Sequence, residues 1–147
     1  MSHLPANHSL RGLYRTLAFL TGVAAVVYGA VGYFSTRDSE FFHREPERVW
    51  GVTTNPAFAV TLVGLGVLVL IGVVIGRNVD VTMNIVLGSV FIAIALVMLC
   101  LIRTDINVLA FSITNVNVSF IAGTVLITAG MYSATHPAPK LPEGKRN

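Results

Sequence analysis

The chain has 147 residues, of which 54% are hydrophobic and 12% are charged, and its mean hydropathy is +0.73. Soluble domains contain about 25% charged residues, so this charge content is too low to cover a soluble surface and excludes a soluble globular protein. The formal net charge of +3 does not indicate nucleic-acid binding, because the basic residues are scattered between apolar segments and form no stripe.

Four apolar segments follow one another along the chain, at residues 13–34, 56–76, 81–102 and 112–134. About 20 apolar residues in a helix cross a hydrocarbon layer of roughly 30 Å, and the segments lack the alternation that a membrane barrel requires. The sequence therefore predicts an all-α membrane protein, an up-down bundle of four transmembrane helices formed by residues 13–134. We expect a cytoplasmic segment at 1–12 and a flexible cytoplasmic tail, rich in Pro and Lys, at 135–147.

Arg11 and Arg15 precede the apolar stretch of the first segment, which in this respect is similar to an export signal. Its apolar run is too long for a typical signal peptide and lacks an Ala-x-Ala cleavage site, so we expect a retained span. The flanks on the side of both termini carry six Lys and Arg residues, against four on the other side. This excess predicts a multi-pass protein of the plasma membrane with both termini in the cytoplasm.

The connection at residues 35–54 is the longest and most charged one between spans. Aromatic and Arg residues are enriched at the centres of protein interfaces, and we take five as candidate partner-docking residues: Phe41, Phe42, Arg44, Arg48 and Trp50. The alternative is an interfacial segment whose aromatic side chains lie at head-group level. His43, Glu45 and Glu47 have no second His or nucleophile nearby, so they predict neither a metal site nor a catalytic site.

Small residues recur in the spans at helical spacing, and close backbone approach is what holds membrane helices together. We therefore expect helix packing at Gly22, Gly29, Gly64, Gly72, Gly76, Gly88, Gly123 and Gly130. Because only residues 77–80 separate the second and third spans, these spans must be antiparallel neighbours. The glycines serve packing within one bundle or, alternatively, the face of a homo-oligomer.

No Asp, Glu, Lys, Arg or His lies in the middle of a predicted span. Proton relays and ion-coupled transporters need ionisable groups there, and haem and metal sites need His, Cys or carboxylate ligands. We therefore predict no catalytic, cofactor or metal site and do not expect an enzyme. Four polar intramembrane candidates remain: Asn84, Asn115, Asn117 and Ser119. We expect the asparagines to cap helix starts near the interface or to bond neighbouring helices. Alternatively, they line a polar pathway or bind a lipid head group or a quinone.

Two segments, GVTTNPAFAVTLVGLG and TNVNVSFIAG, begin the second and fourth spans. They resemble a family of four-span integral membrane proteins of unknown function that is common in actinobacteria. Asn55, Pro56 and Gly66 match the family's pattern in the second span. Phe58 and Leu62 stand where that family carries histidines, so an activity that depends on those histidines would be lost here.

In the fourth span, Asn115, Asn117 and Gly123 are compatible with the same family, whereas Ser119 takes the place of a histidine. The resemblance covers residues 13–132. It also implies an internal repeat, with the first two spans corresponding to the last two.

The expected function is a non-catalytic accessory or scaffold subunit of a larger membrane complex, with a respiratory assembly as one host. The alternative is an oligomeric channel or transporter for a small polar solute, with Asn and Thr side chains lining its pore. A lipid- or quinone-related enzyme is disfavoured, because the chain lacks paired carboxylates and a Ser–His pair. The expected partners are membrane lipids, a larger membrane-protein complex or further copies of this chain.

Overall fold

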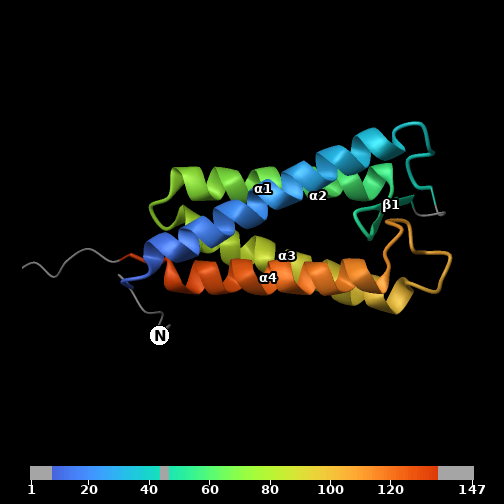
Figure 1. Cartoon of the computed structure of the whole chain (residues 1–147). Helices are drawn as coiled ribbons and strands as arrows, with labels where there is room; N and C mark the ends of the chain where they lie inside the picture. The colour runs from blue at the N-terminus through green and yellow to red at the C-terminus, as the bar shows by residue number, and fades with distance from the viewer. Residues whose placement is uncertain (1–7, 44–46, 136–147) are drawn as a thin grey trace, which may run out of the picture.

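A computed structural model describes residues 8–43 and 47–135 and shows an up-down bundle of four helices (Figure 1). The helices are α1 (Arg11–Thr36), α2 (Pro56–Ile75), α3 (Val79–Leu101) and α4 (Ile113–Tyr132). Two short strands, β1 (Glu47–Val49) and β2 (Val52–Thr54), lie between α1 and α2. The strands and the α3–α4 connection lie at one end of the bundle, the β end, and the α2–α3 connection lies at the opposite turn end. The predicted fold class is confirmed.

All four helices are long and apolar enough to cross a membrane, with mean hydropathies between 1.4 in α4 and 2.9 in α2. Helices α2 and α4 have 20 residues each, which corresponds to about 30 Å, the thickness of a hydrocarbon layer. Helix α1 has 26 residues and is about 9 Å longer than that layer. Helix α1 is therefore long enough to span the layer with a tilt or with its ends beyond the hydrocarbon.

The bundle consists of two tightly packed helix pairs, α1–α2 and α3–α4. In the first pair, a Cβ atom on Gly66 would lie 2.9 Å from the carbonyl oxygen of Gly22. In the second pair, a Cβ atom on Gly123 would lie 2.7 Å from the carbonyl oxygen of Gly88. Such close backbone approach requires residues without a side chain. The two pairs thus use the same kind of packing, as an internal repeat would require.

Most of the other glycines selected from the sequence also lie in contacts between segments. Gly29, Gly72 and Gly130 each have an atom of a neighbouring helix within 3 Å of where a Cβ would be. Gly76 ends α2 with a φ of +63°, a left-handed conformation that favours glycine. Gly64 is different, because it faces away from the bundle with open space around it. The packing prediction is therefore wrong for Gly64 within this chain.

The strands β1 and β2 form an antiparallel hairpin with Val49 opposite Val52. Its two-residue turn consists of Trp50 and Gly51, with φ of +50° and +84°, the geometry that fits the twist of a two-residue hairpin. The Tyr28 hydroxyl of α1 lies 3.0 Å from the carbonyl oxygen of Val52 and donates a hydrogen bond to it. Part of the long charged connection is therefore an ordered element fixed to the bundle.

The predicted spans agree with the helices to within two residues at every end, and the difference at the start of α3 has a consequence. Asn78 has a φ of +68°, and the helix begins at Val79 rather than at the predicted Val81. Asp80 therefore lies in the first turn of α3 instead of in the connection. Its side chain is fully buried, and a buried carboxylate is stable only with charged or hydrogen-bonding partners.

Candidate functional site

The partners of Asp80 are two arginines at the start of α1. The Nε atom of Arg15 lies 3.2 Å from Asp80 Oδ2, and Nη2 of Arg11 lies 3.8 Å from the same oxygen. The arginines are four positions apart, which puts both on one face of the helix. Their side chains are 33% and 29% exposed, so they extend from the buried carboxylate to the surface. We call Arg11, Arg15 and Asp80 the Arg–Asp cluster.

The arginines also join the cluster to the remaining helices. Nη2 of Arg15 donates to the carbonyl oxygen of Val73 in α2 at 2.6 Å, and Nε of Arg11 donates to the carbonyl oxygen of Ser133 at 2.8 Å. Both carbonyls lie at the C-terminal end of a helix, where carbonyl groups lack an amide partner and cations are favoured. With Asp80 in α3, the cluster connects all four helices at the turn end.

Next to the cluster, the bundle interior holds polar groups without partners. Asn84 lies one helical turn from Asp80 and is fully buried. Neither its amide oxygen nor its amide nitrogen has a hydrogen-bond partner among the described residues, and the same holds for the Ser133 hydroxyl. Asp80 is paired by charge, but no aligned hydrogen bond reaches its oxygens. The side chains of Asn84 and Ser133 can therefore still form hydrogen bonds near the turn end.

At the β end, Asn115 of α4 connects the two helix pairs. Its Nδ2 donates to the carbonyl oxygen of Thr53 at 2.7 Å, and its Oδ1 accepts a hydrogen bond from Thr53 Oγ1 at 2.7 Å. The same Oδ1 also accepts from Ser112 Oγ at 2.8 Å, at the start of α4. Asn115 is buried, and these bonds give its amide a structural role in holding β2 against α4.

Asn55 makes a second set of contacts between segments at the β end. Its Oδ1 accepts from the backbone N–H of Phe58 at 2.8 Å and caps α2, while Pro56 occupies the first helical position, as expected for a helix start. Its Nδ2 donates to the carbonyl oxygens of His43 at 3.1 Å and Val108 at 2.9 Å. Asn55 thereby joins α2 to the chain before β1 and to the α3–α4 connection.

The polar candidates selected from the sequence do not lie together. Asn84 is buried near the turn end, Asn115 is buried at the β end, and Asn117 is exposed on the outer side of α4. A pore within one chain lined by all three asparagines does not fit this arrangement. Ser119 is buried and lies at the cleft described below.

The aromatic docking candidates are exposed at the β end. Phe41, Phe42 and Trp50 are 50%, 55% and 72% exposed, and the rings of Phe41 and Phe42 meet edge to face at a centroid distance of 4.8 Å. Arg48 is exposed on β1, whereas Arg44 lies outside the described residues. We call Phe41, Phe42, Arg48 and Trp50 the aromatic surface.

A cleft of about 780 Å³ opens on the side of the bundle between α1 and α4. Its walls are apolar and include Leu20, Ala24 and Val27 of α1 and Val118, Ile121 and Val125 of α4. We call it the lateral cleft.

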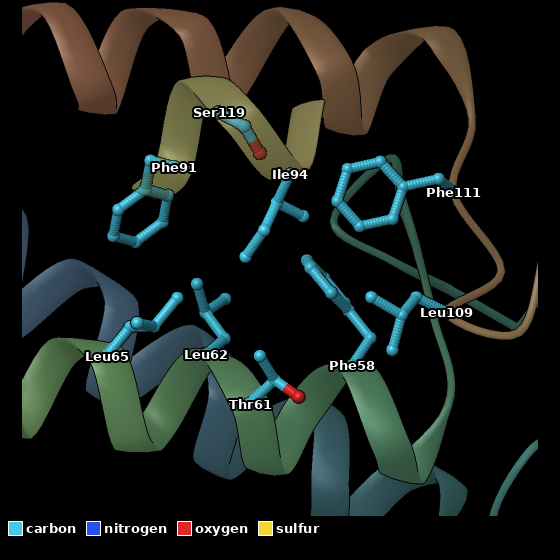
Figure 2. A pocket seen from close by; sticks show the side chains of 9 residues that line it. All are labelled: Phe58, Thr61, Leu62, Leu65, Phe91, Ile94, Leu109, Phe111 and Ser119. Atoms are coloured by element: carbon cyan, nitrogen blue, oxygen red, sulfur yellow. The ribbon is translucent and has the colours of Figure 1, made fainter. Parts of the chain in front are cut away.

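The floor of the lateral cleft is formed by residues that point to the bundle centre: Phe58 and Leu62 of α2, Phe91 of α3 and Ser119 of α4. A small cavity of about 10 Å³ on the other side shares these four residues. Figure 2 shows the Ser119 hydroxyl pointing toward the space between the two helix pairs, opposite Leu62. The lateral cleft thus reaches residues of the bundle core from the α1–α4 side.

Sequence reasoning missed the Arg–Asp cluster, although two signals were present. Arg11 and Arg15 are four residues apart, and so are Asp80 and Asn84, so each pair shares one helix face. The partners lie more than sixty residues apart in the chain, and only the fold brings them together. In the ranges that the structure describes, no group of three or more His, Cys, Asp or Glu side chains is placed to hold a metal ion.

The bundle coincides with the region found by comparison with protein families. A family model described as a domain of unknown function, DUF4383, matches residues 15–132. No curated protein matches the chain, and no solved structure matches it. The matched region contains α2, α3, α4 and all but the first four residues of α1.

Proposed function

We propose that the chain, which belongs to the DUF4383 family, is a non-catalytic accessory or scaffold subunit of a larger membrane complex. The expected host is an assembly of an actinobacterial plasma membrane, with a respiratory complex as one example. In this proposal the aromatic surface is the docking site, and the four-helix bundle holds it at the membrane.

The observation that carries the proposal is that the aromatic side chains are exposed on a fixed backbone. The Tyr28 hydroxyl donates to the β hairpin at Val52. The carbonyl oxygen of Phe41 accepts a hydrogen bond from the backbone N–H of Ala57 at 3.0 Å. Aromatic side chains on an ordered backbone lose little conformational entropy on binding, and Trp and Arg are among the residues that dominate interface energies. The aromatic surface therefore has the properties of a preorganised docking site.

The proposed orientation places the β end outside the cell and the turn end in the cytoplasm. Among the described residues, the turn end carries three arginines against one acid: Arg11, Arg15, Arg77 and Asp80. The β end carries three arginines against four acids: Arg37, Arg48, Arg103, Asp38, Glu40, Glu47 and Asp105. The two ends thus carry equal numbers of arginines among the described residues. Over the whole sequence, the flanks on the side of both termini carry six Lys and Arg residues against four on the other side, and such an excess favours the cytoplasmic side. The docking partner would then be contacted at the external membrane surface.

Affinity purification from native membranes tests the proposal. The full chain, tagged at the C-terminus, is isolated in mild detergent, and the co-eluting proteins are identified and quantified. We expect larger membrane proteins at a fixed ratio, and we expect the double variant Phe42→Ala, Trp50→Ala to lose them by about tenfold or more. Phe19→Ala is the matched control, because Phe19 is an aromatic residue of α1 that is 44% exposed within a span.

Two results would contradict the docking proposal. One is a chain that elutes alone or only with copies of itself, which would favour the channel or transporter alternative and call for flux measurements in vesicles. The other is a fixed set of partners whose recovery does not change in the double variant. That second result would place the interface on another surface of the bundle.

A further inference from the structure

We propose that the lateral cleft binds one acyl chain of a membrane phospholipid, taken from the leaflet on the side of Trp50. The cleft volume of about 780 Å³ lies within the usual range of about 300–1,000 Å³ for small-molecule sites. Its walls belong to the membrane-spanning parts of α1 and α4. Hydrocarbon is the surrounding solvent at this depth. The cleft meets the aromatic surface at Trp50, but the proposed lipid binding does not depend on the proposed docking function.

The floor of the cleft favours a slender occupant over a helix of another protein. Phe58 and Phe91 are only 7% and 5% exposed and face the bundle centre, yet both line the cleft. A helix with its side chains is about 10 Å wide, so it would have to separate α1 from α4 to contact these two residues. An extended hydrocarbon chain reaches them without moving the helices. The depth of the cleft therefore fits a lipid chain.

The length of the cleft fits a chain from one leaflet. Near the turn end, α1 and α4 are bridged by the stacked rings of Tyr14 and Tyr132, whose centroids are 5.0 Å apart. At the other end, Tyr28 and Trp50 line the cleft, and such aromatic side chains are typical of the head-group level. From Tyr28 to Leu20 the wall of α1 extends about 12 Å, close to half of a hydrocarbon layer of about 30 Å.

A polar group at the floor gives the bound chain a direction. Ser119 is 8% exposed and lines the cleft, and its hydroxyl has no hydrogen-bond partner among the described residues. By contrast, the hydroxyls of Thr21 and Ser89 donate to carbonyl oxygens one turn earlier, the usual solution for hydroxyls in apolar helices. An ester carbonyl at the head end of an acyl chain would accept a hydrogen bond from the Ser119 hydroxyl. We therefore infer that the ester lies near Ser119 and that the methyl end extends toward Leu20.

Photolabelling of the full chain tests this inference. Purified protein is reconstituted in vesicles of phosphatidylethanolamine and phosphatidylglycerol that contain a phosphatidylglycerol with a diazirine in one acyl chain. After irradiation, mass spectrometry locates the lipid adducts. We expect adducts on Phe91 at the floor of the cleft, in addition to adducts on Val97, which is 57% exposed on α3 and reports contact with bulk lipid. A diazirine near the ester should label the region of Ser119, and one at the chain end should label the region of Leu20.

Matched variants separate the cleft from the general lipid surface. Ala24→Trp places a large side chain in the cleft, whereas Ala93→Trp places the same side chain at an exposed alanine of α3 that does not line it. We expect Ala24→Trp to lower the Phe91 adducts severalfold while the Val97 adducts stay constant, and Ala93→Trp to change neither. Ala122→Trp, on the opposite wall, repeats the test if the first variant does not fold. Labelling of Val97 without labelling of Phe91, or Phe91 labelling that persists in both cleft variants, would overturn the proposal.

Discussion

Gly123 of α4 faces Gly88 of α3 so closely that a Cβ atom on Gly123 would lie 2.7 Å from the carbonyl oxygen of Gly88. Gly66 and Gly22 have the same relationship in the α1–α2 pair, at 2.9 Å. Lipid tails are as apolar as the side chains they contact, so helix association in a membrane depends on close packing more than on the hydrophobic effect. The stability of each helix pair should therefore depend on its glycines more than on its large apolar residues.

Gly123→Ala is expected to lower the free energy of unfolding by roughly 1–3 kcal/mol, because the added methyl group meets backbone atoms of α3. Gly64→Ala is the matched control, since no atom lies within 4 Å of its Cβ position. Alanine favours a helix over glycine by about 1 kcal/mol, so the control should be as stable as the unchanged chain or slightly more stable. Thermal unfolding in one detergent, followed by circular dichroism, measures both variants. Equal losses of stability in the two variants would show that the contact between Gly123 and Gly88 does not determine the stability of the α3–α4 pair.

Asp80→Ala is expected to destabilise the bundle by about 3 kcal/mol, because it leaves Arg11 and Arg15 without their anionic partner at the turn end. Asp38→Ala provides the control, since the Asp38 side chain is 96% exposed and lies 3.9 Å from Arg37. An exposed ion pair of this kind contributes little to stability. Detergent-titrated unfolding of both variants measures the difference. Unchanged stability of Asp80→Ala would mean that the cluster does not hold the helices together.

Asn115→Ala is expected to loosen the β end, because it removes the bonds to Thr53 and leaves buried backbone groups unpaired, at a cost of about 1–3 kcal/mol. Asn117→Ala is the control, two residues further along the same helix on the exposed side. Hydrogen–deuterium exchange of the β hairpin measures the effect directly. We expect faster exchange of the β2 amides in Asn115→Ala only. Faster exchange in both variants, or in neither, would contradict the assigned role of Asn115.

The fold was predictable because hydropathy and length determine where a helix can cross a membrane. Four apolar runs, each bounded by charged residues or by Gly, Pro and Asn, correspond to α1 to α4. The short α2–α3 connection was sufficient to predict antiparallel neighbours. The spacing of the glycines indicates that helices pack closely but not which glycine faces another helix. Gly66, which the packing prediction omits, contacts Gly22, whereas Gly64 faces outward.

The polar contacts were not predictable, because they depend on residues distant in the chain. The sequence predicts that Asp80 lies in a connection, because a charged residue between two apolar runs usually lies outside the spans. Its burial depends on the side chains of Arg11 and Arg15 reaching across from α1. The lateral cleft was also not predictable from the sequence. It results from how the two helix pairs pack against each other, and no pattern within a single helix indicates it.

The β hairpin has a local sequence signal at its turn. Trp50-Gly51 stands between Val49 and the run Val52-Thr53-Thr54, and a glycine in the second turn position suits the left-handed backbone of a two-residue turn. The strands have only three residues each, which is too short for a clear alternating pattern. Their stability comes from the bonds to Tyr28 and Asn115, which no local pattern shows.

Photo-crosslinking from position 50 in native membranes tests the docking function most directly. A benzophenone-bearing amino acid replaces Trp50 and, in a separate chain, Phe19 as the exposed aromatic control within a span. We predict that position 50 crosslinks to a small, reproducible set of membrane proteins, the same ones that co-purify at a fixed ratio, and that position 19 does not. Crosslinks from position 50 to lipid alone, with no crosslinked protein, would contradict the docking function.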